Sequence, residues 1–544
     1  MSTLITAAQV YAGDPPAPTA TAILLEGERI TWVGEAAEAP PSAERIDLGE
    51  AIVLPGFVDP HLHLIPAVLD MHMADLSAAR TLAEVQDAMR AQVVRVPEGG
   101  WVTGWGYREL VDGADRPLDR WAIDQAVPDR PALVMFSSFH AGVANSAGLA
   151  AVGLGRGTPR MHGGELERGR RGEPNGRVWE RAFGVLENAA HRSGLELWTD
   201  GWDEAVRLKA RELLSVGITH AVDAAVRPNE LARLREPDLP IGLTAMRVGS
   251  GGFYGTPRDA LEGPRTGEGD LTFSIGPVKM FADGGERCAM RIPLRSALRM
   301  LRSLAGSAEG PPVGAAMRTL DVRLTPGGIR SGTLHYPPGL MREMVTEARR
   351  RGFEVAIHAF GNEGIEHALR AFEEAGTGGR IEHATFATGP QAERMARAGI
   401  TAVVQPGHLV SYGETILATG VDAYFPPVPV RTLLDAGVRV AFSSDGPTAI
   451  MDPLGIARAA VERRTVEGSP IGPGEAVTPQ EALRAATVTA AEAAGVGEAK
   501  GMIAPGMQAD LAVLSGDPFH AETRVTETWV AGRRAWPSNF ADPR

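Results

Sequence analysis

The sequence predicts an α/β protein in which a (β/α)₈ TIM-like barrel carries a small β-sandwich domain and a large insertion after the first barrel strand. Three observations lead to this prediction. Eight short apolar runs recur along the middle of the chain, helical patterns separate many of them, and strand-and-turn patterns occur at both ends. Strands that alternate with helices favour parallel pairing, and eight such units can close into a barrel.

Both ends of the chain predict one composite β domain. The first residues hold short strand-like runs that proline and glycine punctuate, and runs of the same character return near the C-terminus. Neither end has a sufficient core of its own. We therefore expect segments 1–52 and 496–544 to form the small β domain, beside a barrel at 53–495.

The barrel strands are expected at 57–58, 217–222, 241–246, 275–281, 353–357, 380–383, 401–404 and 438–443. Two insertions interrupt this series. The first spans about 70–205 and contains a further strand-like run at 132–136, and the second, at 284–338, is rich in Gly, Pro and Arg. Insertions of such length in a barrel usually lie over the active mouth as lids or substrate walls.

Charge and composition exclude several classes of partner. The formal net charge of −13 argues against nucleic acid and anionic membranes, because each attracts a basic face. The single cysteine, Cys288, excludes an internal disulfide and fits a reducing compartment. No secretory signal and no membrane-spanning run is present in the 544 residues. We expect a cytoplasmic homo-oligomer that acts on a small molecule.

Lysine is rare in this chain and occurs only as Lys209, Lys279 and Lys500. Arginine cannot give up its proton in a protein, whereas a buried lysine can. A chain that uses arginine for most positive charges can keep lysine where an amine is needed. Lys209 and Lys500 lie in polar surroundings and are interpreted as surface charges, but Lys279 lies in an apolar run.

Two histidines spaced one residue apart end the first apolar run. Residues i and i+2 of a strand share a face, so His61 and His63 can point at one metal ion. In a barrel the reacting groups lie at the C-terminal ends of the strands. Four other runs carry further ligand types at or near their ends: Lys279, His358, His383 and Asp445.

Five motifs span nearly the whole chain. They are VLPGFVDPHLH at 53–63, GWGY at 104–107, HAGVANSA at 140–147, PVKMFADG at 277–284 and GMIAPGMQADL at 501–511. Together they resemble the amidohydrolase superfamily in its metal-dependent (β/α)₈ form. The branch that the chain resembles most is amidohydrolase family 3, which includes N-substituted formamide deformylases and shares the large first insertion.

The resemblance implies a divalent metal centre with two ions, and oxygen and imidazole ligands suit two Zn²⁺. His61, His63 and Asp445 would bind the first, more buried ion. His358 and His383 would bind the second. Mn²⁺, Fe²⁺ and Ni²⁺ are the alternatives for such a ligand set.

Lys279 has the most specific implied role, because a CO₂-derived carbamate on its amine would bridge both ions, whereas an ammonium cannot ligate. A metal-bound hydroxide would attack the substrate carbonyl, and Asp445 would relay a proton to the leaving amine. The alternative for Lys279 is an ordinary ion pair with Asp283 in a mononuclear site. By resemblance, His140 and Asn145 are expected to line the substrate pocket.

Several residues also have plainer interpretations. His358 and His383 could be core histidines with backbone partners, and Asp445 could cap a helix. Cys288 is interpreted as a packed thiol and His220 as a structural residue. The remaining histidines are assigned to the surface, to a lid or to the support of the site: His72, His162, His191, His335, His367, His408 and His520.

The sequence therefore predicts a metal-dependent hydrolase that cleaves a non-peptide C–N bond of a linear amide, an N-formyl or an N-acyl compound. A mononuclear deaminase or a cyclic-amide hydrolase on the same scaffold is the alternative. A third hypothesis is a barrel that binds metal or ligand without catalysing a reaction. The fold alone does not distinguish these three hypotheses.

Overall fold

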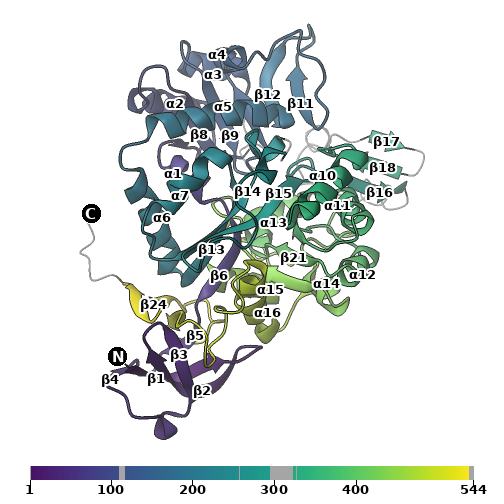
Figure 1. Cartoon of the computed structure of the whole chain (residues 1–544). Helices are drawn as coiled ribbons and strands as arrows, with labels where there is room; N and C mark the ends of the chain where they lie inside the picture. Colours follow the sequence, from purple (N-terminus) through teal and green to yellow (C-terminus); the bar gives the residue numbers. More distant parts are fainter. Residues whose placement is uncertain (1, 109–116, 256–257, 295–322, 326–327, 538–544) are drawn as a thin grey trace.

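The protein is described from a computed structural model, which covers residues 2–108, 117–255, 258–294, 323–325 and 328–537. Its largest unit is a barrel of eight parallel strands that neighbour one another in chain order (Figure 1). Each of the eight predicted runs overlaps one of them, so the predicted fold class is confirmed. The strands are β6 (Phe57–Leu62), β13 (Ile218–Val226), β14 (Gly242–Arg247), β15 (Phe273–Phe281), β19 (Val355–Ala359), β20 (Arg380–His383), β21 (Thr401–Val404) and β22 (Arg439–Phe442).

The barrel closes where the end of β22 meets β6. The backbone N–H of Asp445 donates to the carbonyl of His61 at 2.9 Å. The buried carboxylate of Asp59 accepts hydrogen bonds from the backbone N–H groups of His61 and Ser444, each at 3.2 Å. These contacts bring the C-terminal ends of the first and last strands side by side, together with the ligand types that follow them.

Helices cover the outside of the barrel and bury their apolar faces against its strands. The helix α11 is typical, because Ile365, Ala368, Leu369 and Phe372 recur at helical spacing and are all buried. The helices are α6 (Trp202–Ser215), α7 (Leu231–Arg235), α10 (Pro338–Arg350), α11 (Asn362–Glu374), α12 (Gly389–Arg397), α13 (Gly407–Thr419), α14 (Val430–Asp435), α15 (Pro453–Glu462), α16 (Pro479–Ala486) and α17 (Val488–Ala493).

One end of the barrel interior is packed with apolar side chains. Val58, Val222 and Val403 from the strands form a cluster with Ala490 and Ala491 of α17. Val58 precedes the two histidines of β6 along the strand, so this packed layer lies on the N-terminal side of the strands. The opposite end, where the strands finish, is left for polar side chains.

Strands from both ends of the chain form a second sheet, as the sequence predicted. The antiparallel pair of β5 and β23 joins the two segments, and β1 pairs along its length with β2, β4 and β5. The strands are β1 (Ser2–Ala12), β2 (Ala17–Glu26), β3 (Arg29–Gly34), β4 (Glu44–Asp47), β5 (Ile52–Pro55), β23 (Leu511–Leu514), β24 (Val525–Val530) and β25 (Arg533–Trp536). The domain boundaries given above stay a prediction.

The described residues of the first insertion, with helix α1 that leads into it, form a six-stranded sheet with five helices, on the side of the barrel opposite the small β domain (Figure 1). The sequence predicted only the strand at 132–136. The others were missed because they are short, contain glycine or are charged, such as GELER at 164–168. The strands are β7 (Ala74–Asp75), β8 (Val102–Tyr107), β9 (Ala132–Phe136), β10 (Ala141–Ala144), β11 (Gly164–Arg168) and β12 (Pro174–Glu180). The helices are α1 (Leu64–Asp70), α2 (Leu82–Arg95), α3 (Arg120–Ala126), α4 (Ser146–Ala151) and α5 (Arg181–Leu197).

The described part of the second insertion is a small three-stranded sheet of β16 (Met290–Pro293), β17 (Arg323–Thr325) and β18 (Gly328–Ser331). It is tied to the barrel helix α11, because the backbone N–H of Arg291 donates to the side chain of Asn362 at 2.8 Å. Among the described residues, no helix is long and apolar enough to cross a membrane. The cytoplasmic location and the homo-oligomeric assembly stay predictions.

Candidate metal centre

All six predicted ligands gather around one cavity, at the C-terminal ends of five barrel strands. This position follows from the fold, because only these strand ends face the cavity side of the barrel. The residues are His61 on β6, His63 at its end, Lys279 on β15, His358 on β19, His383 on β20 and Asp445 after β22.

His61, His63 and Asp445 form the tightest group. One possible ligand atom from each lies within 4.8 Å of the other two. Atom Oδ1 of Asp445 is 3.4 Å from Nε2 of His61 and 3.2 Å from Nε2 of His63. Asp445 has a φ of 56°, a left-handed conformation that non-glycine residues seldom adopt outside functional sites. The three side chains therefore face one point, as the binding of a single metal ion requires.

His358 and His383 lie beside this group. Their ring centroids are 4.5 Å apart, and the ring of His383 is 5.0 Å from that of His61. The Nε2 atom of His358 is buried, and the described residues offer it no hydrogen-bond partner. Nδ1 of His383 instead lies 2.8 Å from the side-chain oxygen of Gln405. Neither ring is hydrogen-bonded to a backbone group among the described residues. The interpretation of His358 and His383 as core histidines with backbone partners is therefore not supported.

Lys279 is buried next to the first group, with Nζ 3.3 Å from Nε2 of His61. Burial lowers its pKa to about 8, so the neutral amine is accessible near neutral pH. The alternative of an ion pair with Asp283 is wrong. That carboxylate accepts three backbone N–H groups, at 2.8, 2.9 and 2.9 Å, and Lys279 makes no ion pair with any described residue.

Two buried polar residues, Glu382 and Gln405, hydrogen-bond to the ring nitrogens of the proposed ligands His61 and His383. The sequence analysis singled out neither of them. Glu382 accepts from Nδ1 of His61 at 2.5 Å and from the guanidinium of Arg380 at 2.9 Å. Gln405 contacts His383 and donates to the hydroxyl of Ser443 at 2.9 Å. Glu382 adjoins His383 in the sequence. The φ of His383, 74°, turns the chain there so that both side chains reach His61.

The electrostatics of the site favour neutral imidazoles and an ionised carboxylate. Burial lowers the pKa of His61 to about 4 and holds those of His358 and His383 well below their usual range. For Asp445, burial alone would raise the pKa, but the adjacent His408 and His63 side chains outweigh burial and keep it well below its usual range. Neutral imidazole and carboxylate are the protonation states that metal ligands need.

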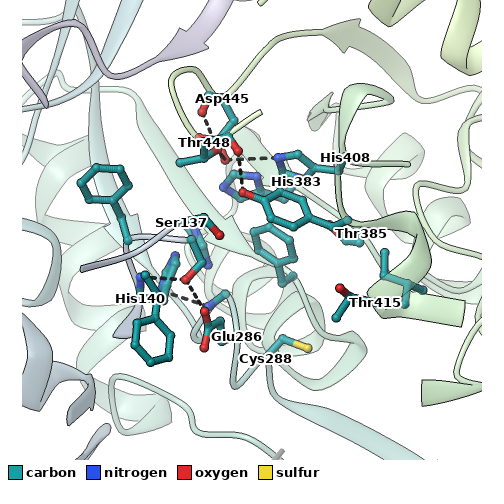
Figure 2. A pocket seen from close by; sticks show the side chains of 18 of the residues that line it. Ser137, His140, Glu286, Cys288, His383, Thr385, His408, Thr415, Asp445 and Thr448 are labelled. Carbon is teal, nitrogen blue, oxygen red and sulfur yellow. Dashed lines mark hydrogen bonds and ion pairs between the residues drawn. The ribbon is translucent and has the colours of Figure 1, made fainter. Parts of the chain in front are cut away.

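His408 is a site residue that the sequence analysis named only within the group of histidines assigned to the surface, to a lid or to the support of the site. Its Nε2 atom lies 3.4 Å from Oδ2 of Asp445, the oxygen turned away from the other two histidines, and Thr448 donates to the same oxygen at 3.2 Å (Figure 2). The sequence contained the signal for this role, because His408 follows the seventh barrel strand, β21.

The alternative role of Asp445 as a helix cap is wrong. The N-cap of α15 is Asp452, whose side chain accepts two backbone N–H groups.

The first insertion contributes His140 to the cavity, where the ring lies 5.2 Å from that of His358. Nδ1 of His140 is 2.9 Å from Oε2 of Glu180, and the same oxygen is 3.3 Å from Nε2 of His335. Burial opposes ionisation of Glu180, but His140 and His335 outweigh burial and lower its pKa to about 2. The position predicted for His140, at the pocket, agrees with the structure; its role in binding substrate is a proposal.

The prediction for Asn145 is wrong, because its side chain lies inside the insertion and does not line the cavity. Its side-chain oxygen accepts from the backbone N–H groups of Ala132 and Gly148, at 2.9 and 2.7 Å. Its amide donates to the carbonyls of Val127 and Arg130, both at 2.8 Å. Every hydrogen-bonding position of this amide is occupied by backbone, so we assign Asn145 a structural role as the cap of α4.

The cavity above the ligands has a volume of about 290 Å³. Most of its wall is aromatic or aliphatic, and both insertions contribute to it. Cys288 lines it as well, in contact with an apolar cluster around Met290 and Phe386. Apolar wall residues come from five regions: Tyr107, Phe136 and Phe139 of the first insertion, Phe253 and Phe281 of the barrel, Met290 and Ile292 of the second insertion, Phe360 and Phe386 beyond β19 and β20, and Tyr412 and Ile416 of α13.

His220 lies away from this cavity, near the start of β13, where its Nε2 atom is 2.9 Å from the hydroxyl of Thr244. This contact agrees with the structural role expected for His220.

The cavity at the carboxyl ends of the barrel strands contains neutral imidazoles, one ionised carboxylate and one buried lysine. Such a cavity can hold divalent metal and a small organic substrate.

A model of the amidohydrolase family matches residues 44–535. The chain belongs to the amidohydrolase family. It is therefore an enzyme, a metal-dependent hydrolase that acts on C–N bonds. The amidohydrolase is 33% identical to the N-substituted formamide deformylase of Arthrobacter pascens, over 97% of this chain and 97% of that protein. It is 27% identical to YtcJ of Bacillus subtilis (strain 168), over 88% of this chain and 87% of that protein. The predicted family 3 branch is thus confirmed.

A solved structure confirms the fold of the amidohydrolase. The crystal structure of an uncharacterized metal-dependent hydrolase from Pyrococcus horikoshii OT3 aligns with a TM-score of 0.69 at 21% sequence identity. The alignment covers 95% of this chain and 98% of that one, so it includes the insertions as well as the barrel.

Proposed function

We propose that this amidohydrolase cleaves the C–N bond of linear N-formyl or N-acyl amines and releases a carboxylate and an amine. The observation that carries the proposal is the gathering of four histidines, one carboxylate and one buried lysine at the mouth of the barrel. The unpartnered Nε2 of His358 and the ionised Asp445 fit a cation better than they fit a packed core.

The ligand set fits two divalent ions, for which we propose Zn²⁺. His61, His63 and Asp445 would hold the first ion and His358 and His383 the second, with a carbamate on Lys279 shared between them. Such ions lower the pKa of water to about 7 and polarise a carbonyl oxygen.

Asp445 has the geometry of the residue that moves the proton. One of its oxygens faces His61 and His63, and the other faces His408 and Thr448. We propose that Asp445 takes a proton as water attacks the carbonyl and gives it to the leaving nitrogen as the C–N bond breaks. His408 orients Asp445 for this transfer, because its ring contacts the oxygen that does not face the other two histidines.

Two observations support a linear amide with an apolar substituent. The relative from Arthrobacter pascens is named for N-substituted formamides, and it is similar to this chain over nearly the full length. The cavity wall is mainly aromatic and aliphatic, which suits an apolar group on the substrate. His140 stands beside His358 at the same cavity, in a position to contact the acyl group.

The test is a substrate screen with protein reconstituted with Zn²⁺ and bicarbonate. A panel of N-formyl and N-acyl amines is incubated with the protein, and free primary amine is measured by a fluorogenic amine reagent. We expect amine release from several members, at a rate roughly 10²-fold or more lower from protein carrying Asp445→Asn. Ammonia release from an amino-heterocycle panel, without amine release from amides, would support the deaminase reading. Ring opening of cyclic amides alone would support the cyclic-amide hydrolase.

A further inference from the structure

Arg108 is a cation of the cavity wall that follows β8 in the first insertion. Its guanidinium lies over the ring of Tyr412, 5.8 Å from the ring centroid, and both residues line the cavity. A cation–π contact of this kind attracts the guanidinium and uses none of its N–H groups, which stay available to an acceptor.

Two buried arginines near this site are neutralised by carboxylates, whereas Arg108 is half-buried. Arg227 pairs with Glu187 at 2.8 Å, and Arg380 pairs with Glu382 at 2.9 Å. Arg108 differs, since none of the residues that the structure describes forms an ion pair with it. A guanidinium that faces a largely apolar cavity, with no anionic partner among the described residues, is suited to an anion brought by a ligand.

The charges of the cavity also fix where such an anion fits. Glu286 lines the same cavity and accepts from the hydroxyl of Ser138 at 2.6 Å. Figure 2 shows Glu286 near His140, across the cavity from His408 and Thr448. Glu286 would repel an anion and Arg108 would attract one, so a substrate anion is expected at Arg108.

Tyr412 connects this cation to the reacting groups. Its hydroxyl donates to the carbonyl of Thr448 at 2.5 Å, which fixes the ring. The ring lies 5.4 Å from that of His408, whose Nε2 is 3.4 Å from Asp445. Arg108 therefore lies next to a chain of contacts that leads through Tyr412 and His408 to Asp445.

We propose that Arg108 binds a carboxylate of the substrate, so that the preferred substrates are N-formyl or N-acyl amino acids with an apolar side chain. The proposal rests on the proposed amide hydrolysis and adds the anionic group to it. The apolar wall accepts the side chain, Arg108 holds the carboxylate in two parallel hydrogen bonds, and the amide lies toward the histidines and Asp445.

The experiment compares two substrates that differ in one group. N-formyl-phenylalanine carries the carboxylate, and N-formyl-2-phenylethylamine has hydrogen in its place. With the reconstituted full-length protein, we expect kcat/KM for the acid to exceed that for the neutral amide by roughly 10-fold or more, the scale of a charge-assisted contact. In Arg108→Gln this ratio should fall to about 1, through a higher KM for the acid. Arg108→Lys should lie between, because an ammonium keeps the charge but loses the paired geometry.

Arg90→Gln is the matched control, because it removes a cation from the surface of α2 in the same insertion, where Arg90 pairs with Asp87. It should keep the substrate ratio of the unaltered protein. Equal or better hydrolysis of the neutral amide by the unaltered protein overturns the proposal, and so does an equal loss on both substrates in Arg108→Gln.

Failure of the proposed function has a separate signature, in which neither compound releases amine. Calorimetric titration of the same two compounds then decides the role of Arg108. Tighter binding of the acid that is lost in Arg108→Gln supports the anion site, and equal binding of the two compounds overturns it. Thermal melting of each variant shows whether it is folded.

Discussion

Oε2 of Glu382 lies 2.5 Å from Nδ1 of His61, and both groups are completely buried. Burial opposes ionisation of Glu382, but Arg380 and His61 outweigh burial and lower its pKa below the usual range. An ionised carboxylate only accepts, so Nδ1 of His61 must carry the proton. Nε2 is left with its lone pair toward Lys279 and Asp445, which is the tautomer that binds a metal ion.

The first prediction follows from this pair. Glu382→Gln should weaken metal binding by roughly 10- to 100-fold, because partners of this kind orient metal-ligating histidines and raise their basicity. The measurement is the dissociation constant of Zn²⁺, by competition with a chromogenic chelator. Glu393→Gln, on the exposed surface of α12, is the control and should leave that constant unchanged. An unaltered constant in Glu382→Gln contradicts the assigned role.

Lys279 gives the second prediction. Lys279→Ala should lose metal and activity, since the proposed bridge between the two ions disappears, and short carboxylates added to the buffer should restore part of both. Lys279→Arg should behave like the Ala variant, because a guanidinium cannot form the carbamate. Metal content by atomic emission and amine release are the two readouts. Full metal content and activity in either variant would show that no bridge is needed.

The pH dependence of activation is the third prediction. Burial lowers the pKa of Lys279 from 10.5 to about 8, and only the neutral amine adds CO₂, losing a proton as the carbamate forms. At fixed dissolved CO₂, the rate of activation of metal-free protein should rise about 10-fold per pH unit below pH 8 and level off above it. The sign for stability is the same, because the unfolded chain binds more protons between pH 8 and 10.5, so the free energy of unfolding of metal-free protein rises across that window. A flat activation rate from pH 6 to 9 would count against a carbamate.

Asn145 gives a fourth prediction, on stability. Asn145→Ala leaves two buried N–H groups and two carbonyls without partners, so we expect the free energy of unfolding to fall by about 2 kcal/mol or more. Asn145→Asp keeps the two accepted bonds but sets a carboxylate oxygen against the carbonyls of Val127 and Arg130, so it should not restore the lost stability. Thermal melting measures the loss, and KM should stay near that of the unaltered protein. A normal melting temperature with a raised KM would return Asn145 to the substrate pocket.

The sequence was most informative where one physical rule decided the position. Parallel strands of a barrel end on one side, so ligand types at strand ends had to meet, and His61, His358 and Asp445 do. The same rule applied to β21 would have indicated His408. Glu382 and Asn145 show the limit of the approach. Both are polar residues whose partners come from distant segments, and only the folded chain shows that one faces a ligand and the other caps a helix.

The last prediction concerns Asp445 and its two differently placed oxygens. Asp445→Asn keeps the shape of the side chain and an oxygen toward His61 and His63, so we expect the fold and much of the bound metal to persist. The amide cannot accept and return a proton as a carboxylate does, so kcat should fall roughly 10²-fold or more.

His408→Gln separates proton transfer from orientation. It leaves Asp445 ionisable but removes the ring 3.4 Å from Oδ2, so we expect a smaller loss in kcat than in Asp445→Asn, with metal content retained. His61→Ala should differ from both, losing metal occupancy together with activity, because it removes a proposed ligand. Amine release and metal content measured on the same samples distinguish the three outcomes. A near-normal kcat in Asp445→Asn with full metal content would remove Asp445 from the proton path, and the transfer would then have to be assigned to another group at the cavity.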